Sequence, residues 1–133
     1  MTISENPLVA FLATRDAARA RAFYEGALGL RVVDDTPFAL VFEVKGTQLR
    51  IQKVETFAPH PFTSLGWKVS DIAQAVGDLQ KRGIAFERYD FLSQDSSGVW
   101  TTPDGAKVAW FKDPDGNTLS ISEEPQPANR GSG

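Results

Sequence analysis

Two segments of the chain repeat apolar residues at the spacing of one helix face. Each segment starts at an aspartate, Asp16 or Asp71, and ends at a glycine, Gly29 or Gly83. Aspartate can accept hydrogen bonds from the first-turn amides of a helix, and glycine can adopt the left-handed conformation that ends one. We therefore predict two helices with matching start and stop signals. The apolar positions that follow the i, i+3, i+4, i+7 spacing are Ala20, Phe23, Tyr24, Ala27 and Leu28, then Ile72, Ala75, Val76 and Leu79. We expect Phe23 and Tyr24 in the core, with the Tyr24 hydroxyl reaching the surface.

Short strand-like runs surround both helices in the same order. One run precedes each helix and one follows it, and a hairpin then closes each half of the chain. The hairpin turns are rich in Gly, Asn and Asp, which tolerate positive φ. The order strand–helix–strand–strand–strand thus occurs twice, which indicates an α+β fold of two βαβββ modules. The predicted strands are 8–13, 30–33, 38–44 and 49–54 in the first module, and 65–69, 84–88, 107–111 and 118–122 in the second.

The modules span residues 7–54 and 64–123 and are joined by a linker at 55–63. We take residues 1–123 as a single domain and the polar, proline- and glycine-rich stretch 124–133 as a disordered tail.

Composition narrows the possible functions. The 14 basic residues are outnumbered by 17 acidic ones, which argues against a nucleic-acid partner. The chain has no cysteine, so thiolate chemistry and disulfides are excluded. No apolar run approaches a membrane span, and no signal-peptide pattern starts the chain, so we expect a cytoplasmic protein without a membrane partner.

Two motifs around this repeat carry a family resemblance. Asp16 with the stretch Phe23–Leu30, and the stretch Phe111–Leu119, resemble the first-module and closing-hairpin signatures of the vicinal-oxygen-chelate superfamily, which includes glyoxalases, bleomycin-resistance proteins and dioxygenases. The resemblance covers about residues 8–123. It implies that the modules pair their sheets into a concave half-barrel, usually within a homodimer. It leaves the activity open, since this fold serves both enzymes and drug-binding proteins.

The resemblance also implies four positions where metal-using members place His, Glu or Gln. Here these positions hold Val9, Arg50, Ser64 and Ser120. Valine has no lone pair, an arginine repels a divalent ion, and serine hydroxyls are poor ligands compared with imidazole or carboxylate. We therefore expect no metal and no other cofactor. His60, the only histidine, is interpreted as a solvated linker residue, although a metal held by His60 with Glu43 is an alternative.

Strand alternation extends the predicted cavity beyond these four positions. Gln52 shares the parity of Arg50, and Phe11 shares that of Val9. Matching the two hairpins places Phe38, Leu40 and Phe42 inside in the first module, with Glu43 on the opposite face, and Val108 and Trp110 inside in the second. Trp100 is a candidate lid or dimer contact, and Trp67 is assigned to packing beneath a helix. The predicted ligand-binding set is Phe11, Phe38, Leu40, Arg50, Gln52, Ser64, Trp100, Val108, Trp110 and Ser120.

Several of these residues have a purely structural alternative. Phe11, Phe38 and Leu40 are equally well interpreted as core, and Trp110 as a core tryptophan. Arg50 either pairs with an acid such as Glu43 or remains free for an anionic or carbonyl-bearing ligand.

Three functions therefore remain. The favoured one is a metal-free protein that binds or sequesters an aromatic natural product or antibiotic, with no catalytic residue. The alternatives are an enzyme of the lyase, isomerase or dioxygenase type with a non-standard or partner-supplied active site, and an interaction domain with a vestigial cavity.

Overall fold

A computed structural model describes residues 2–125, so most of the tail predicted to be disordered, residues 126–133, lies outside the described residues. The chain forms two compact units. Unit 1 consists of the chain up to Pro61 together with Asp113–Asn117, and unit 2 of Phe62–Lys112 together with the chain from Thr118 onward. No helix in the described part is long and apolar enough to span a membrane.

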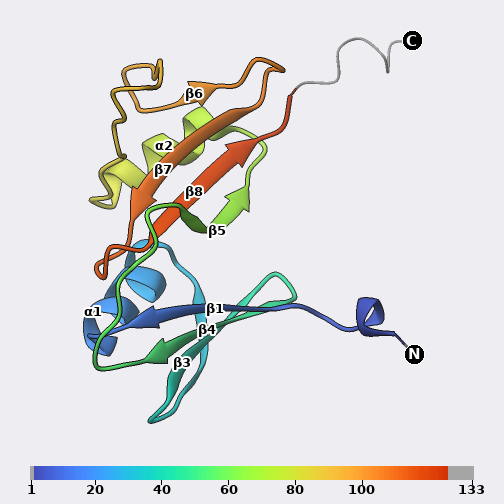
Figure 1. Cartoon of the computed structure of the whole chain (residues 1–133), viewed down its shortest axis with the longest axis vertical. Helices are drawn as coiled ribbons and strands as arrows, with labels where there is room; N and C mark the ends of the chain where they lie inside the picture. Colours follow the sequence, from blue (N-terminus) through green and yellow to red (C-terminus); the bar gives the residue numbers. More distant parts are fainter. Residues whose placement is uncertain (1, 126–133) are drawn as a thin grey trace. The chain divides into compact units, whose positions relative to one another are not determined.

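Each unit contains one four-stranded mixed sheet and one principal helical segment (Figure 1). The strand orders are β1-β4-β3-β2 and β5-β8-β7-β6, in which the first pair is parallel and the others are antiparallel. The predicted α+β class and duplicated module are thus confirmed. The elements of unit 1 are a 3-10 turn (Ile3–Glu5), β1 (Val9–Thr14), α1 (Ala17–Arg21), the π-helical η2 (Ala22–Ala27), β2 (Arg31–Asp35), β3 (Ala39–Val44) and β4 (Thr47–Lys53). Those of unit 2 are β5 (Thr63–Lys68), α2 (Ile72–Lys81), β6 (Trp100–Thr101), β7 (Lys107–Lys112) and β8 (Thr118–Glu123).

The helix boundaries follow the predicted signals. Asp16 accepts a hydrogen bond from the Arg19 amide, and Asp71 accepts one from the Gln74 amide. Gly29 and Gly83 have φ values of 75° and 90°, in the left-handed region that favours glycine. The same local chemistry therefore starts and ends both helical segments.

The core of each unit lies between the helix and one face of its sheet. In β4 and β8 the residues on this face, Leu49 with Ile51 and Leu119 with Ile121, are at most 4% exposed. Trp67 stacks on the fully buried Phe111 with ring centroids 6.5 Å apart, which confirms its assignment to the helix-covered face.

One predicted strand is wrong. Residues 84–88 form only an isolated bridge from Phe86 to Phe111, and the fourth strand of the second sheet is β6. Both Phe86 and β6 pair with β7, so this edge of the sheet is interrupted by the long loop of residues 87–99 (Figure 1). In unit 1 the corresponding edge is the single strand β2, which has one irregularity between Val32 and Asp34.

The turn between β7 and β8, residues Asp113–Asn117, belongs to unit 1. Two buried aspartates organise this turn. Asp113 is 6% exposed and accepts a 2.6 Å hydrogen bond from the Tyr24 hydroxyl and a 2.8 Å bond from the Asn117 side-chain amide. Asp115 is 7% exposed and accepts hydrogen bonds from the Thr14 hydroxyl, 2.5 Å, and the Arg15 amide, 2.9 Å. Neutral donors supply the hydrogen bonds to both buried carboxylates, and the half-exposed Arg15 guanidinium lies 3.8 Å from Asp115 as a further ion-pair partner.

This network corrects the expectation for Tyr24. Its side chain is fully buried, and its hydroxyl points to Asp113 rather than to solvent. Burial, and then the neighbouring Asp113 charge, raise the pKa of Tyr24 far above its usual value, so the hydroxyl remains a donor at any physiological pH.

Replacing Tyr24 with phenylalanine should therefore lower the free energy of unfolding by about 2 kcal/mol, because a buried carboxylate loses a charge-assisted hydrogen bond. Urea unfolding followed by circular dichroism measures the change. Tyr89→Phe is the matched control, since its hydroxyl makes no hydrogen bond within the described chain. Equal stability of the two variants would contradict the prediction.

Candidate functional site

The sheet face opposite the helix in unit 1, called here the unit 1 face, is defined by the strand register. Arg50 lies between Phe11 on β1 and Val41 on β3. Residues paired across β1, β4 and β3 form a row, and in the two rows beside that of Arg50 the β4 position is a glutamine. These rows are Val9, Gln48 and Glu43 on one side, and Ala13, Gln52 and Ala39 on the other. Phe11, Arg50 and Gln52 therefore lie together, as the alternation of β1 and β4 predicted.

Strand β3 has the opposite parity from the predicted one. Leu40 pairs with Ile51 and is fully buried, so its assignment to the cavity is wrong. Phe42 is likewise buried and lies 5.9 Å from the Tyr24 ring, on the helix-covered side. The hairpin match failed because it shifted β3 by one residue, and a shift of one residue moves every side chain to the other face.

Two further residues of the first module change place as a result. Phe38 lies just before β3 and is 79% exposed, outside the paired rows of the unit 1 face. Glu43, predicted on the opposite face, pairs with Gln48 and belongs to the unit 1 face.

The sheet face opposite the helix in unit 2, called here the unit 2 face, carries a connected group of aromatic rings. Trp110 stacks with Trp100 at a centroid distance of 6.2 Å and meets the edge of Tyr89 at 5.5 Å. Phe91 extends the group, with its ring 5.6 Å from Tyr89 and 83% of its surface exposed. We call these four residues the aromatic cluster. The predicted residues Trp100, Val108 and Trp110 are brought together here, because Val108 pairs with Trp100.

Sequence reasoning missed Tyr89 and Phe91. Both lie on the loop of residues 87–99, which strand periodicity cannot place. The sequence signal for them was the run Tyr89-Asp90-Phe91. In this run two aromatic residues flank an aspartate just before a serine- and glycine-rich segment, which is unusual for a solvent-exposed loop.

Side chains within the loop hold it in shape. The Gln94 amide donates to the Glu87 and Gly98 carbonyls and accepts from the Tyr89 amide at 2.7 Å. Asp95 accepts hydrogen bonds from the amides of Ser97 and Val99. The loop therefore presents Tyr89 through specific hydrogen bonds and not only through ring packing.

The hydroxyl side chains of unit 2 lie beside the aromatic cluster. Ser120 pairs with Trp110 on one side and Gly66 on the other. A β-carbon at Gly66 would lie 2.5 Å from the Ser120 hydroxyl oxygen and 3.3 Å from the Ser120 carbonyl oxygen, so a side chain at this position would displace the Ser120 hydroxyl. Ser64 sits in the irregularity between Thr63 and Leu65, and the Trp110 indole donates to the Thr63 hydroxyl at 3.0 Å.

The positions where metal-using relatives carry ligands do not suit a metal here. Val9 is apolar, Arg50 carries a fixed positive charge, and Ser64 and Ser120 offer neutral hydroxyls. Within residues 2–125, no group of three or more His, Cys, Asp or Glu side chains is placed to hold an ion.

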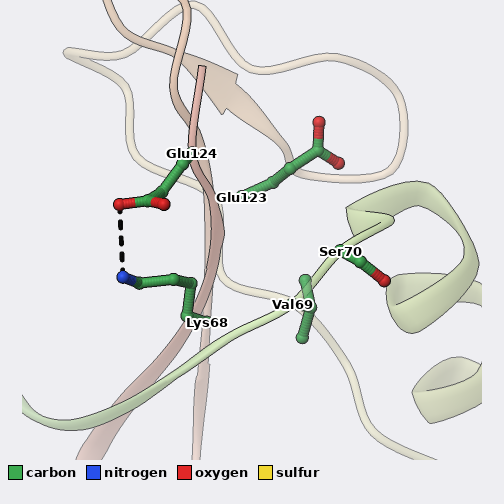
Figure 2. Close-up of a pocket in the computed structure, with 5 residues that line it drawn as sticks. All are labelled: Lys68, Val69, Ser70, Glu123 and Glu124. Atoms are coloured by element: carbon green, nitrogen blue, oxygen red, sulfur yellow. Dashed lines mark hydrogen bonds and ion pairs between the residues drawn. The ribbon is translucent and has the colours of Figure 1, made fainter. Parts of the chain in front are cut away.

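A pocket of about 320 Å³ lies elsewhere on unit 2, lined by Lys68, Val69, Ser70, Glu123 and Glu124 (Figure 2). Lys68 and Glu124 form an exposed ion pair across it, and Glu123 accepts the amide of Ile72 at the start of α2. Its charged groups are thus already engaged, and it contains none of the predicted site residues.

Comparison with known proteins identifies the family. The model of the Glyoxalase/Bleomycin resistance protein/Dioxygenase superfamily matches residues 7–121. No curated protein matches the chain.

Solved structures show the same fold across most of the chain. An antibiotic binding protein from a Streptomyces species is 25% identical, with a TM-score of 0.71 over 92% of this chain and 98% of its own. A superfamily member from Sphaerobacter thermophilus is also 25% identical, with a TM-score of 0.69 over 90% of this chain and 97% of its own. A lactoylglutathione lyase from Agrobacterium tumefaciens is 20% identical, with a TM-score of 0.68 over 92% and 96%, and this likeness shows the fold alone.

Acid should loosen the loop at Asp95. Burial alone would raise the pKa of Asp95, but the amide and hydroxyl donors of Val99 and Ser97 together lower it below its usual value. Because the folded-state pKa is depressed, the stabilisation is present at neutral pH and is lost as the pH falls through that lowered pKa. NMR titration of the Ser97 and Val99 amides should show their hydrogen bonds weakening below the ordinary carboxylate range.

Asp95→Ala, which removes the acceptor oxygen, should show the loosened loop at neutral pH, whereas Asp90→Ala, on the same loop, should titrate like the wild type. Ser97 and Val99 amide signals that Asp95→Ala leaves unchanged would disprove this account of the loop.

Proposed function

The chain belongs to the glyoxalase/bleomycin resistance protein/dioxygenase superfamily, and on that premise we propose that it is a metal-independent protein that binds an aromatic natural product or antibiotic. Sequestration of such a compound would give resistance to it. The Streptomyces relative, described as an antibiotic binding protein, supports this choice within the family.

The observation that carries the proposal is the aromatic cluster. Trp100, Trp110 and Tyr89 are all partly exposed, although large aromatic rings gain most when they are buried. A planar ligand laid against these rings removes apolar surface from water and adds ring–ring contact. The nearby hydroxyl of Ser120 and the apolar Val108 give the mixture of polar and apolar groups that small-molecule sites use.

Donor chemistry at the four family positions supports metal independence. A hydrocarbon, a guanidinium and two neutral hydroxyls cannot replace imidazole and carboxylate ligands.

Glu43 is the observation that favours the alternative, an enzyme of this family. Its carboxylate lies on the unit 1 face one row from Arg50, where a general base would meet a bound substrate. That carboxylate also accepts the Gly46 amide at 2.9 Å, which ties it to the β3–β4 turn. The binding function therefore remains the better supported one. Turnover that is lost in Glu43→Gln but retained in the aromatic variants would favour the enzyme instead.

Trp110→Leu should weaken the binding of planar polycyclic antibiotics by about tenfold or more, because a stacking surface is lost with its buried area. Quenching of tryptophan fluorescence during titration measures the affinity. Trp67→Phe, which changes a tryptophan on the helix-covered face, should leave the affinity unchanged. Equal weakening by both variants would indicate a general loss of structure rather than a lost contact.

We also propose that the protein is a homodimer. Leu8 and Phe38 of unit 1 are 80% and 79% exposed as large apolar side chains, and exposed apolar side chains are enriched at interfaces.

Native mass spectrometry of freshly purified protein should show twice the chain mass without a metal ion, either carrying or accepting an organic molecule. A monomer would refute the dimer, and one divalent ion per chain would refute metal independence.

A further inference from the structure

The Arg50 guanidinium has an unusual environment for a cation on a sheet. It is only partly exposed, and its neighbours in the same row are the apolar Phe11 and Val41. Its partner within the described chain is the side-chain oxygen of Gln48, 3.2 Å from Nη1. No carboxylate of residues 2–125 forms an ion pair with it. A partly desolvated cation without a counter-ion is costly, so this arrangement needs an explanation.

Acids are present on the same face, but their own backbone neighbours hold them. Glu43 accepts the Gly46 amide in the β3–β4 turn, and Asp34 accepts the Asp35 amide at 2.9 Å. Asp34 is separated from Arg50 by Val41 in the strand register. Both carboxylates are therefore engaged locally, and the guanidinium is left with a neutral partner.

That partner uses one of the five N–H donors of Arg50. A guanidinium presents these donors in a planar fork that matches the two oxygens of a carboxylate. The bond to Gln48 also orients that side chain, with its oxygen toward Arg50. Gln52, one row away, adds a second amide on the same face. The polar groups thus favour an oxyanion with two acceptor atoms.

The surrounding residues favour an organic anion over an inorganic one. Phe11 has 56% of its surface exposed beside Arg50, and Val9 has 41% exposed in the next row. An inorganic anion gains nothing from such surface, whereas an aryl or unsaturated acid covers it while its carboxylate meets the fork.

We propose that Arg50 on the unit 1 face is a binding site for the carboxylate of a planar organic acid, with Phe11 as the apolar surface beside it. This inference rests on the proposed binding function, to which it adds the charge and acidic group of the ligand. It makes no use of the aromatic cluster of unit 2.

The test compares three probes: 2-naphthoate, its neutral isostere 2-naphthamide, and inorganic phosphate. Binding is followed by the backbone amide and arginine side-chain signals in ¹H–¹⁵N NMR spectra, which locate the contact residue by residue. Naphthoate should shift the signals of Phe11, Gln48 and Arg50 and should bind at least tenfold more tightly than naphthamide or phosphate at low salt.

Arg50→Gln should remove most of this preference, and Arg50→Lys, which keeps the charge but not the fork, should retain part of it. Arg31→Gln is the matched control, since Arg31 is an exposed arginine on the edge strand of the same sheet. Spectra of the free variants verify that each is folded. If Arg50→Gln does not fold, Arg50→Lys alone decides, because loss of the fork must still lower naphthoate affinity.

Equal binding of naphthoate and naphthamide, with shifts confined to the aromatic cluster, would overturn the carboxylate site and leave the proposed binding function intact. Phosphate binding as tight as that of naphthoate would overturn the choice of an organic acid. The absence of shifts in unit 1 with any probe at millimolar concentration would overturn the site altogether.

Discussion

Burial of two carboxylates without a buried cation is the constraint on which unit 1 depends. Asp113 and Asp115 are both almost inaccessible, and an ion in such surroundings is tolerated only when hydrogen bonds replace water. The Tyr24 and Thr14 hydroxyls supply them from the helix and from the end of β1. The Asn117 amide also donates to the Ala13 carbonyl, so the turn holds the same end of β1 through backbone as well as side chains. β1 also contains Phe11. The hydrogen bonds of the turn therefore fix one end of the strand that supplies Phe11 to the unit 1 face.

The duplicated module keeps one face and changes the other. At matching hairpin positions, Leu49 with Ile51 and Leu119 with Ile121 pack under the helices, because each unit needs an apolar core. The intervening positions are not bound by that requirement. They hold Gln48, Arg50 and Gln52 in one unit, and Thr118, Ser120 and Ser122 in the other. A polar, cationic face and an aromatic, hydroxyl-bearing face have therefore arisen on the same architecture.

Local signals predicted the fold better than they predicted the site. The helix caps at Asp16 and Asp71 and the closing glycines depend on near neighbours in the chain, and the structure reproduces them. The side of the sheet on which Leu40 lies depends on how β3 aligns with β4. Because β3 has buried residues on both faces, its hydrophobic pattern does not indicate which residues face which side. The hydroxyl of Tyr24 was misplaced because its partner lies 89 residues away. Tyr89 and Phe91 were missed because a loop has no periodicity to read.

In the proposed function, Arg50 lets a member of this superfamily recognise an oxyanion without a bound metal ion. The family resemblance implies that metal-using members place a ligand at this position, where the positive charge comes from the bound ion. Here the side chain itself carries the charge, held by Gln48 and bordered by Phe11. A guanidinium binds and orients an oxyanion, but it has no open coordination position and does not generate hydroxide from water. Under the proposed function, arginine at this position keeps recognition of an oxyanion and lacks Lewis-acid chemistry, which favours a binding protein over a hydrolytic or oxygen-activating enzyme.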